Sequence, residues 1–386
     1  MRIVIAPDSY KGSVSALCVA QAIERGVQRV FRNAEIFKAP IADGGEGTVE
    51  ALVAATSGTF CQTAVTGPLG ETVIAQWGLL GDGATAVIEM AAASGLPLVA
   101  PDRRDPRITT SRGVGELIRA ALDRGLRRLI IGIGGSATND GGAGMAEALG
   151  ARFLDAAGAS LPPGGAALNR LAAIDLSGLD PRLRETQVQV ACDVDNPLCG
   201  PRGASAVYGP QKGATSAMVA ELDAALRRYG RIAARTFGHD VTEQPGAGAA
   251  GGLGAALLWF ANARLQSGIG IVIEAAGLRD RIRRADWVIT GEGATDDQTA
   301  FGKAPVGIAK VAQEFGVPVV CLSGGLGRDY QTIYASGIDA AASTTPRPMT
   351  LEDCLAAGPA LIEDAAERLA RLIAVGIRIA PRPGVI

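Results

Sequence analysis

Short apolar runs alternate with stretches of helical periodicity along most of the chain. Residues 2–6 form an apolar run that predicts a buried strand, and the apolar positions between 14 and 30 have helical spacing. The order of strand, polar loop and helix returns at 36–55, at 129–149 and again after residue 286. This pattern predicts an α/β fold, in which ligands bind at the carboxyl ends of parallel strands.

A different pattern occupies part of the middle of the chain. Three predicted strands between residues 60 and 90 are separated by tight Gly-containing turns, as in an antiparallel meander. Beyond it, we expect helices over 218–236 and 255–265. Since the two ends of the chain resemble each other more than either resembles the middle, we predict one discontinuous α/β domain, 1–66 plus 283–386. A second, mixed α/β domain, 67–282, is inserted into it.

The composition is that of a globular protein with a substantial core. Of 386 residues, 48% are apolar and 20% are charged, and 37 Lys and Arg nearly balance 39 Asp and Glu. This balance does not favour binding to nucleic acid or to a membrane surface, and at 4% the aromatic residues are too few for base-stacking platforms. We therefore expect neither nucleic acid nor a membrane as a partner.

Cysteine and histidine usage limits the chemistry further. The six cysteines show no C-x-x-C spacing, and His239 is the single histidine. Reduced thiols in a cytosolic enzyme fit this pattern, whereas a zinc site or a histidine-based triad does not. The chain starts with a strand and shows no signal-peptide or membrane-spanning pattern, so we expect a cytoplasmic enzyme whose general base is a carboxylate.

Charged residues among glycines follow five of the predicted strands. These loops are 8–11, 43–46, 136–140, 193–196 and 292–303, with Lys212 in a sixth. Each loop alone has an ordinary explanation, such as a helix cap, a tight turn or a solvated charge. Their recurrence favours phosphoryl transfer, in which carboxylates hold Mg²⁺, lysines neutralise the transferred group and one carboxylate accepts a hydroxyl proton.

Common nucleotide-binding motifs do not explain these loops. No G-x-x-x-x-G-K-[ST] motif surrounds Lys11, Lys212 or Lys303, which excludes a P-loop enzyme, and protein-kinase signatures are absent. Residues 246–251 match the glycine pattern of a dinucleotide-binding motif, but no strand precedes them. The residues alone leave open a kinase of a small hydroxy acid, an NAD-dependent oxidoreductase and a nucleotide-binding regulatory module.

Eight motifs spread over the chain are more specific: Ala6-Pro-Asp-Ser-Tyr-Lys-Gly12, Ala42-Asp-Gly-Gly-Glu-Gly-Thr48, Ile88-Glu-Met-Ala-Ala-Ala-Ser-Gly95, Gly132-Ile-Gly-Gly-Ser-Ala-Thr-Asn-Asp-Gly-Gly-Ala-Gly144, Ala191-Cys-Asp-Val-Asp-Asn-Pro197, Gly209-Pro-Gln-Lys-Gly213, Pro245-Gly-Ala-Gly-Ala-Ala-Gly-Gly-Leu-Gly254 and Thr290-Gly-Glu-Gly293. With them the chain resembles the type I glycerate kinase family from end to end. The resemblance implies phosphorylation of D-glycerate with ATP and Mg²⁺, usually to 2-phosphoglycerate. It also implies a flavodoxin-like (Rossmann-type) domain carrying the inserted domain.

The resemblance lets us assign catalytic roles as hypotheses. Asp193 is predicted to deprotonate the C2 hydroxyl of the substrate. Lys11 is predicted to stabilise the charge of the transferring phosphoryl group, together with Lys212 or Lys303. We expect the active site in the cleft between the two domains, where closure excludes water from ATP, and we expect a monomer or homodimer.

Further residues are predicted to bind metal and substrates. Asp43, Glu46 and Glu292 are predicted Mg²⁺ ligands, directly or through water, although the carboxylate roles are interchangeable. Contacts with glycerate or nucleotide are predicted for Asp8, Ser9, Gly44, Gly45, Ser136, Asn139, Asp140, Asn196, Asp296, Gln298 and Lys303. The family usually reads T-G-E-G-R-x-D at the last motif, whereas this chain has Ala294 at the arginine position. If that arginine binds phosphate or the glycerate carboxylate in the family, this chain lacks the contact, and its affinity or substrate choice differs.

Overall fold

The computed structural model describes residues 1–42, 44–301 and 303–379, and backbone contacts divide the chain into two compact units. The first unit comprises the described residues of Met1–Asp43, Glu50–Thr56 and Val272–Ile386, and the second comprises Gly44–Val49 and Ser57–Ile271. The first unit is therefore discontinuous in sequence, and the chain leaves it and returns.

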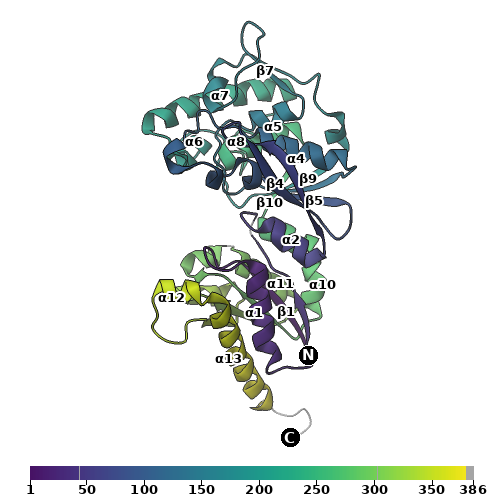
Figure 1. Ribbon diagram of the computed structural model, residues 1–386, viewed down its shortest axis with the longest axis vertical. Helices are drawn as coiled ribbons and strands as arrows, with labels where there is room; N and C mark the ends of the chain where they lie inside the picture. Colours follow the sequence, from purple (N-terminus) through teal and green to yellow (C-terminus); the bar gives the residue numbers. More distant parts are fainter. Residues whose placement is uncertain (43, 302, 380–386) are drawn as a thin grey trace. The chain divides into compact units, whose positions relative to one another are not determined.

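A five-stranded parallel sheet forms the centre of the first unit (Figure 1). Its strands lie in the order β15 (Ala340–Ser343), β13 (Val319–Ser323), β11 (Trp287–Gly291), β1 (Arg2–Pro7) and β2 (Glu35–Lys38). Strands β1 and β11 come from opposite ends of the chain, yet they pair in parallel from Ile3 opposite Trp287 onward. The two ends of the chain therefore build one sheet.

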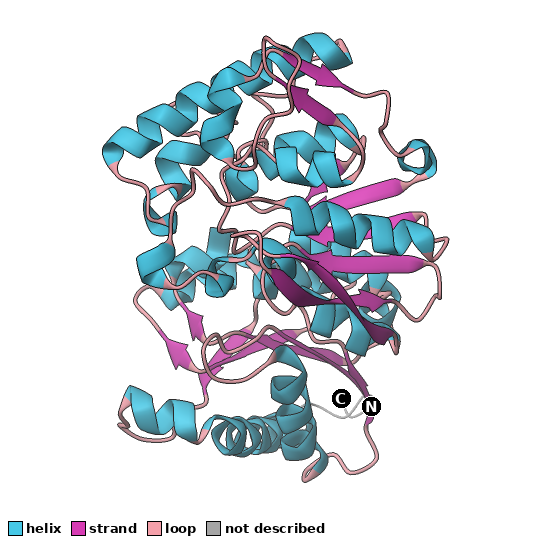
Figure 2. Cartoon of the chain, turned by 45° about the horizontal axis from the view of Figure 1, so that its top comes forward, coloured by secondary structure: helices cyan, strands magenta, loops and turns pink. Residues whose placement is uncertain are grey.

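Helices cover both faces of this sheet (Figure 2). Helices α1 (Ala16–Gln28), α11 (Ala304–Glu314) and α13 (Gly358–Ile379) contact its strands, while α10 (Leu278–Arg283) packs on α11 and α12 (Leu351–Ala356) on α13. Ile3 and Ile5 of β1 share a buried core with α1 and α13, whereas α11 contacts β1, β11 and β13. Because side chains alternate along a strand, α11 packs against the residues that point away from the α1 side.

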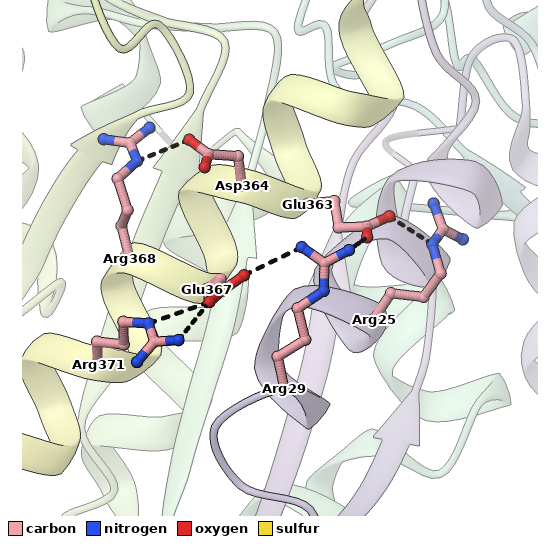
Figure 3. Close-up of polar contacts among 7 residues, drawn as sticks. All are labelled: Arg25, Arg29, Glu363, Asp364, Glu367, Arg368 and Arg371. Carbon is pink, nitrogen blue, oxygen red and sulfur yellow. Dashed lines mark hydrogen bonds and ion pairs between the residues drawn. The ribbon is translucent and has the colours of Figure 1, made fainter.

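Helices α1 and α13 are also joined by ion pairs along their exposed edges (Figure 3). Glu363 of α13 accepts a hydrogen bond from Nε of Arg25 at 2.6 Å and another from Arg29, and Arg29 also pairs with Glu367 at 3.0 Å. Each arginine is about half exposed. Such surface pairs are individually weak, so apolar packing supplies most of the stability of this contact.

The second unit contains a six-stranded mixed sheet. Its strands lie in the order β10 (Arg264–Gln266), β9 (Gln187–Ala191), β6 (Arg128–Gly132), β5 (Thr85–Glu89), β4 (Thr72–Leu79) and β3 (Thr59–Thr66). Strands β3, β4 and β5 pair antiparallel, which confirms the predicted meander, and β5, β6, β9 and β10 pair in parallel. A separate two-stranded antiparallel sheet is formed by β7 (Arg152–Leu154) and β8 (Ala173–Asp175).

Helices pack against this sheet and form a large apolar core with it. The helices are α3 (Ala91–Ser94), α4 (Arg112–Asp123), α5 (Ala143–Ala148), α6 (Ala204–Tyr208), α7 (Ser216–Phe237) and α8 (Ala249–Phe260). Trp77, Ile131 and Tyr229 are fully buried in this core. The chain changes from one unit to the other before Gly44, within α2 (Thr48–Thr56), directly after α2 and within α9 (Gly268–Ala275). Among the helices that the structure describes, none combines the length and apolar character needed to cross a membrane.

Three predictions, one for a helix and two for domain boundaries, need correction. The helix predicted for 255–265 ends at Phe260, because Arg264–Gln266 pairs with β9 as the edge strand β10. The domain boundary predicted at residue 66 lies at Ser57 in the contacts, because β3 pairs with β4 along its whole length. The second predicted boundary, at 283, lies at Val272.

Gly26 of α1 tests the packing of α1 against α13. A Cβ atom here would lie 2.8 Å from Cβ of Ala366 and would overlap the carbonyl oxygen of Glu363. We therefore expect Gly26→Val to lower the free energy of unfolding by about 2–3 kcal/mol. The control is Gly376→Ala on α13, where nothing lies within 4 Å and the helix propensity of Ala should stabilise by up to about 1 kcal/mol. Urea denaturation measures both, and an unchanged midpoint for Gly26→Val would contradict this packing.

Candidate active site

In the first unit, the loops that follow β1 and β11 lie against each other. The backbone nitrogen of Asp8 donates to the carbonyl oxygen of the last residue of β11 at 2.8 Å. A Cβ atom at Gly293 would lie 3.3 Å from the backbone nitrogen of Lys11. Asp8 and Ser9 are partly exposed and Lys11 is exposed. The predicted residues of the first loop are therefore accessible to a ligand.

Glu292 lies mostly buried directly after β11. Its Oε1 accepts hydrogen bonds from Oγ1 of Thr299 at 2.6 Å and of Thr295 at 3.3 Å, and burial raises the pKa of its carboxyl group. Nζ of Lys303 lies 3.8 Å from Oε2 of Glu292 and 3.7 Å from Oδ1 of Asp296. Since both distances exceed hydrogen-bond length, the ammonium lies between two carboxylates and is tightly bonded to neither.

The carboxylates of Glu292 and Asp296 fit a magnesium site in which substrate oxygens supply the remaining ligands. Mg²⁺ is usually bound by one or two carboxylates together with waters and phosphate oxygens. No group of three or more acidic, histidine or cysteine side chains suited to a metal occurs within 1–42, 44–301 and 303–379. Oε2 of Glu292 is a suitable single ligand, whereas Asp43 lies outside the described residues. Gln298 is exposed, and its backbone nitrogen donates to Oδ1 of Asp296 at 3.0 Å.

In the second unit, the loop at 44–45 lies directly on the glycine-rich loop that follows β6. A Cβ atom at Gly132 would lie 2.5 Å from the carbonyl oxygen of Gly44, and one at Gly134 would lie 2.9 Å from Cα of Gly45. Neither position can hold a larger residue without displacing backbone. Two of the predicted motifs, far apart in sequence, are therefore in contact because both have glycine at the crossing.

Glu89 and Tyr10 adjoin predicted site residues but were not predicted themselves. Oε1 of Glu89, at the end of β5, accepts from the backbone nitrogen of Val49 at 2.7 Å, and burial and the nearby charge of Glu46 raise its pKa. Tyr10 is buried, and its hydroxyl donates to the carbonyl oxygen of Leu322 at 2.7 Å. The signal for Glu89 was available, since it is a carboxylate that directly follows an apolar run. Glu46 itself is exposed.

Lys212 is enclosed by the glycine-rich loop. Its side chain is 1% exposed, and Nζ donates to Oγ of Ser136 at 2.7 Å and to the carbonyl oxygen of Thr138 at 2.6 Å. Burial lowers the pKa of Lys212 to about 7, and the negative charge of Asp140 opposes this shift. The predicted direct contact between Lys212 and a phosphoryl group therefore finds no support here, because the loop covers the ammonium.

Asn139 and Asp140 are fully buried and hold the loop from inside. Oδ2 of Asp140 accepts from the backbone nitrogen and the hydroxyl of Ser111, both at 2.8 Å, and burial raises the pKa of its carboxyl group. Nδ2 of Asn139 donates to Oγ of Ser205 at 2.9 Å. These contacts give both residues a structural role, and their contact with glycerate or nucleotide stays a prediction.

Asp193 and Asn196 follow β9 in the same unit and differ in accessibility. Asp193 is exposed, and its two carboxylate oxygens lie 3.2 and 3.3 Å from the backbone nitrogen of Gly268, which donates to them. Asn196 donates to the carbonyl oxygen of Arg202 at 2.7 Å and accepts from the hydroxyl of Tyr208 at 2.5 Å. Asn196 therefore holds its loop, while the predicted base Asp193 is open to solvent.

The same fold and motifs occur in known proteins. A model of the glycerate kinase family matches residues 3–374. The glycerate kinase of Bacillus subtilis (strain 168) is 55% identical over 383 residues, 98% of each chain. The glycerate 2-kinase of Escherichia coli (strain K12) is 53% identical over 378 residues, 98% of this chain and 99% of that protein.

A solved structure agrees with these relatives. The crystal structure of a protein assigned as glycerate kinase 2 from Salmonella typhimurium LT2 is 52% identical and matches with a TM-score of 0.90. The match covers 98% of this chain and 100% of that one, so the mixed α/β fold with parallel strands is shared along the whole length. The chain belongs to the glycerate kinase family.

Proposed function

We propose that this protein transfers the γ-phosphoryl group of ATP to the C2 hydroxyl of D-glycerate, with 2-phospho-D-glycerate and ADP as products. Family membership and the 53% identity to a protein named glycerate 2-kinase support the proposal. The structural observation that carries it is the ammonium of Lys303 between the carboxylates of Glu292 and Asp296. Cations and carboxylates at strand ends are what phosphoryl transfer requires.

We also propose that the first unit is flavodoxin-like. Its strands lie in the spatial order β2-β1-β11-β13-β15, which in chain order is the 2-1-3-4-5 arrangement of that fold. Folds of this kind bind ligands beside the first and third strands, where the strand order reverses. Asp8 follows the first of these strands and Glu292 the other. The topology therefore supports the same ligand site as the side-chain chemistry, while an active site between the units and a cytoplasmic location stay predictions.

In this proposal the reaction forms a bond between the substrate's C2 oxygen and the γ-phosphorus and breaks the bond from that phosphorus to ADP. Bound Mg²⁺ would neutralise charge on the phosphate oxygens, held by Glu292 with Glu46 or Asp43. Lys11 and Lys303 would neutralise the transferring group. The proton of the C2 hydroxyl would go to Asp193.

The first test is the reaction itself. With ATP, Mg²⁺ and D-glycerate, we expect ADP release that depends on D-glycerate, and phosphorus NMR should show the 2-phospho isomer. Tartronate and lactate are the comparison substrates, since a kinase of another hydroxy acid would prefer one of them. The proposal would be refuted if no ADP were released with glycerate or with its analogues. A substrate-dependent absorbance change with nicotinamide cofactors would refute it as well.

Lys303 tests the strand-end charge group. We expect Lys303→Met to lower kcat by about 10²-fold or more, because a cation that meets the transition-state charge is removed. The control is Lys310→Met on α11, an exposed lysine for which we expect wild-type kcat. Steady-state kinetics with both substrates measure the change, and wild-type kcat in Lys303→Met would remove Lys303 from the mechanism.

Asp193 tests the proposed base. Asp193→Asn keeps an oxygen that can accept from Gly268 while losing the proton-accepting carboxylate, so we expect kcat to fall by about 10²–10⁴-fold with ATP binding retained. The matched control is the neighbouring exposed Asp195→Asn, which loses only a surface ion pair with Arg202. Near-normal turnover by Asp193→Asn would show that another group accepts the proton.

A further inference from the structure

Unsatisfied polar atoms gather at the glycine-rich loop of the second unit. Among the residues that the structure describes, five buried side-chain nitrogen or oxygen atoms lack a hydrogen-bond partner. Oγ1 of Thr138 and Oδ1 of Asn139 belong to the loop, Oγ of Ser94 belongs to a residue whose carbonyl accepts from the loop, and Tyr229 packs against Gly141. Buried polar groups are normally paired with protein groups or ordered water, so each of these atoms has the capacity for one further hydrogen bond.

The hydroxyl of Ser136 is a further group with capacity to bind. Its Oγ accepts from the ammonium of Lys212 at 2.7 Å, so the hydroxyl hydrogen must point elsewhere. The structure shows no acceptor for that hydrogen among the described residues. Ser136 is 7% exposed, and Gly135 directly before it is exposed.

The ammonium of Lys212, next to Ser136, has no carboxylate in direct contact among the described residues. Within the described part of the chain, no carboxylate lies within 4 Å of its Nζ, whose partners are a neutral hydroxyl and a carbonyl oxygen. A buried cation without a counter-ion is unfavourable unless an anion joins it. A polarised hydroxyl donor above a buried ammonium is suited to a carboxylate or phosphate oxygen.

We propose that Ser136 and Lys212 form an anion subsite, in which the Ser136 hydroxyl donates to a carboxylate or phosphate oxygen of a substrate and Lys212 supplies the compensating charge beneath it. The subsite rests on the proposed function, since D-glycerate offers the carboxylate and ATP the phosphate. Lys212 acts here through Ser136 and is a positioning residue. This role differs from the direct phosphoryl contact predicted from the sequence.

The charge state of Lys212 makes the subsite sensitive to pH. Burial lowers the pKa of Lys212 to about 7. The negative charge of Asp140, in the glycine-rich loop, acts in the opposite direction. Asp140 in turn interacts with Glu147 of α5, whose pKa burial raises to about 7, and with Tyr229 of α7. A bound anion stabilises the ammonium, so it raises the pKa of Lys212 and binding takes up protons. Affinity should fall as pH rises above about 7, by up to about tenfold per unit.

Isothermal titration calorimetry of the full chain tests the subsite without any variant. D-glycerate and, separately, a non-hydrolysable ATP analogue with Mg²⁺ are titrated between pH 6 and 9 in two buffers of different ionisation enthalpy. We expect net proton uptake above pH 7 with one of these ligands. Uptake with D-glycerate identifies the carboxylate as the anion, and uptake with the analogue identifies the phosphate. Uptake with neither overturns the subsite.

Variants separate the two residues. Lys212→Met should abolish the proton uptake and weaken binding about tenfold or more. Ser136→Ala should weaken binding while the proton uptake persists. The control Lys310→Met should bind as the wild type does. Circular dichroism confirms that each variant is folded. Wild-type uptake in Lys212→Met would overturn the proposal. If the wild-type protein takes up no proton but phosphorylates D-glycerate with ATP, only the subsite is wrong. If the wild-type protein turns over none of the hydroxy acids, the proposed function is refuted as well.

Discussion

Close approach of backbone to backbone is the constraint on which both candidate ligand regions depend. In the second unit, the 44–45 loop crosses the loop after β6 at a distance that excludes a side chain at Gly132 or Gly134. In the first unit, a Cβ atom at Gly291 would overlap the carbonyl oxygen of Leu322 on the neighbouring strand. The 52 glycines of the chain are therefore partly explained by packing. They let loops at strand ends touch and so bring polar side chains from distant motifs together.

Elements with strong periodicity could be predicted from the sequence. The apolar spacing between 14 and 30 corresponds to α1, and Ser15 caps that helix by accepting from Cys18. The alternation at 60–90 corresponds to β3, β4 and β5. Side-chain period and turn residues are local properties, so one sequence contains enough information to identify these elements. The strand-end position of the predicted ligand residues follows from the same information.

Features decided by tertiary contacts could not be predicted in this way. Arg264–Gln266 continues an apolar helical pattern in sequence but is recruited as an edge strand by β9. Lys212 follows a Gly-Pro-Gln turn that is typical of a surface loop, yet it is buried because residues 136–138 provide two acceptors for it. Asp140 resembles a ligand residue, but Ser111 from a separate segment takes its Oδ2. In each case the deciding partner lies far away in sequence.

The energetics of the glycine-rich loop separate structural from functional polar groups. Asp140 has its oxygens satisfied by backbone and hydroxyl donors, which repays much of the free energy of burying it. Thr138 and Asn139 keep unpaired buried atoms, each of which costs about 1–3 kcal/mol. A loop that served only to turn the chain could replace these residues with apolar ones of similar size and gain stability. In the proposed anion subsite beside the enclosed lysine, a bound substrate or an ordered water would complete these hydrogen bonds.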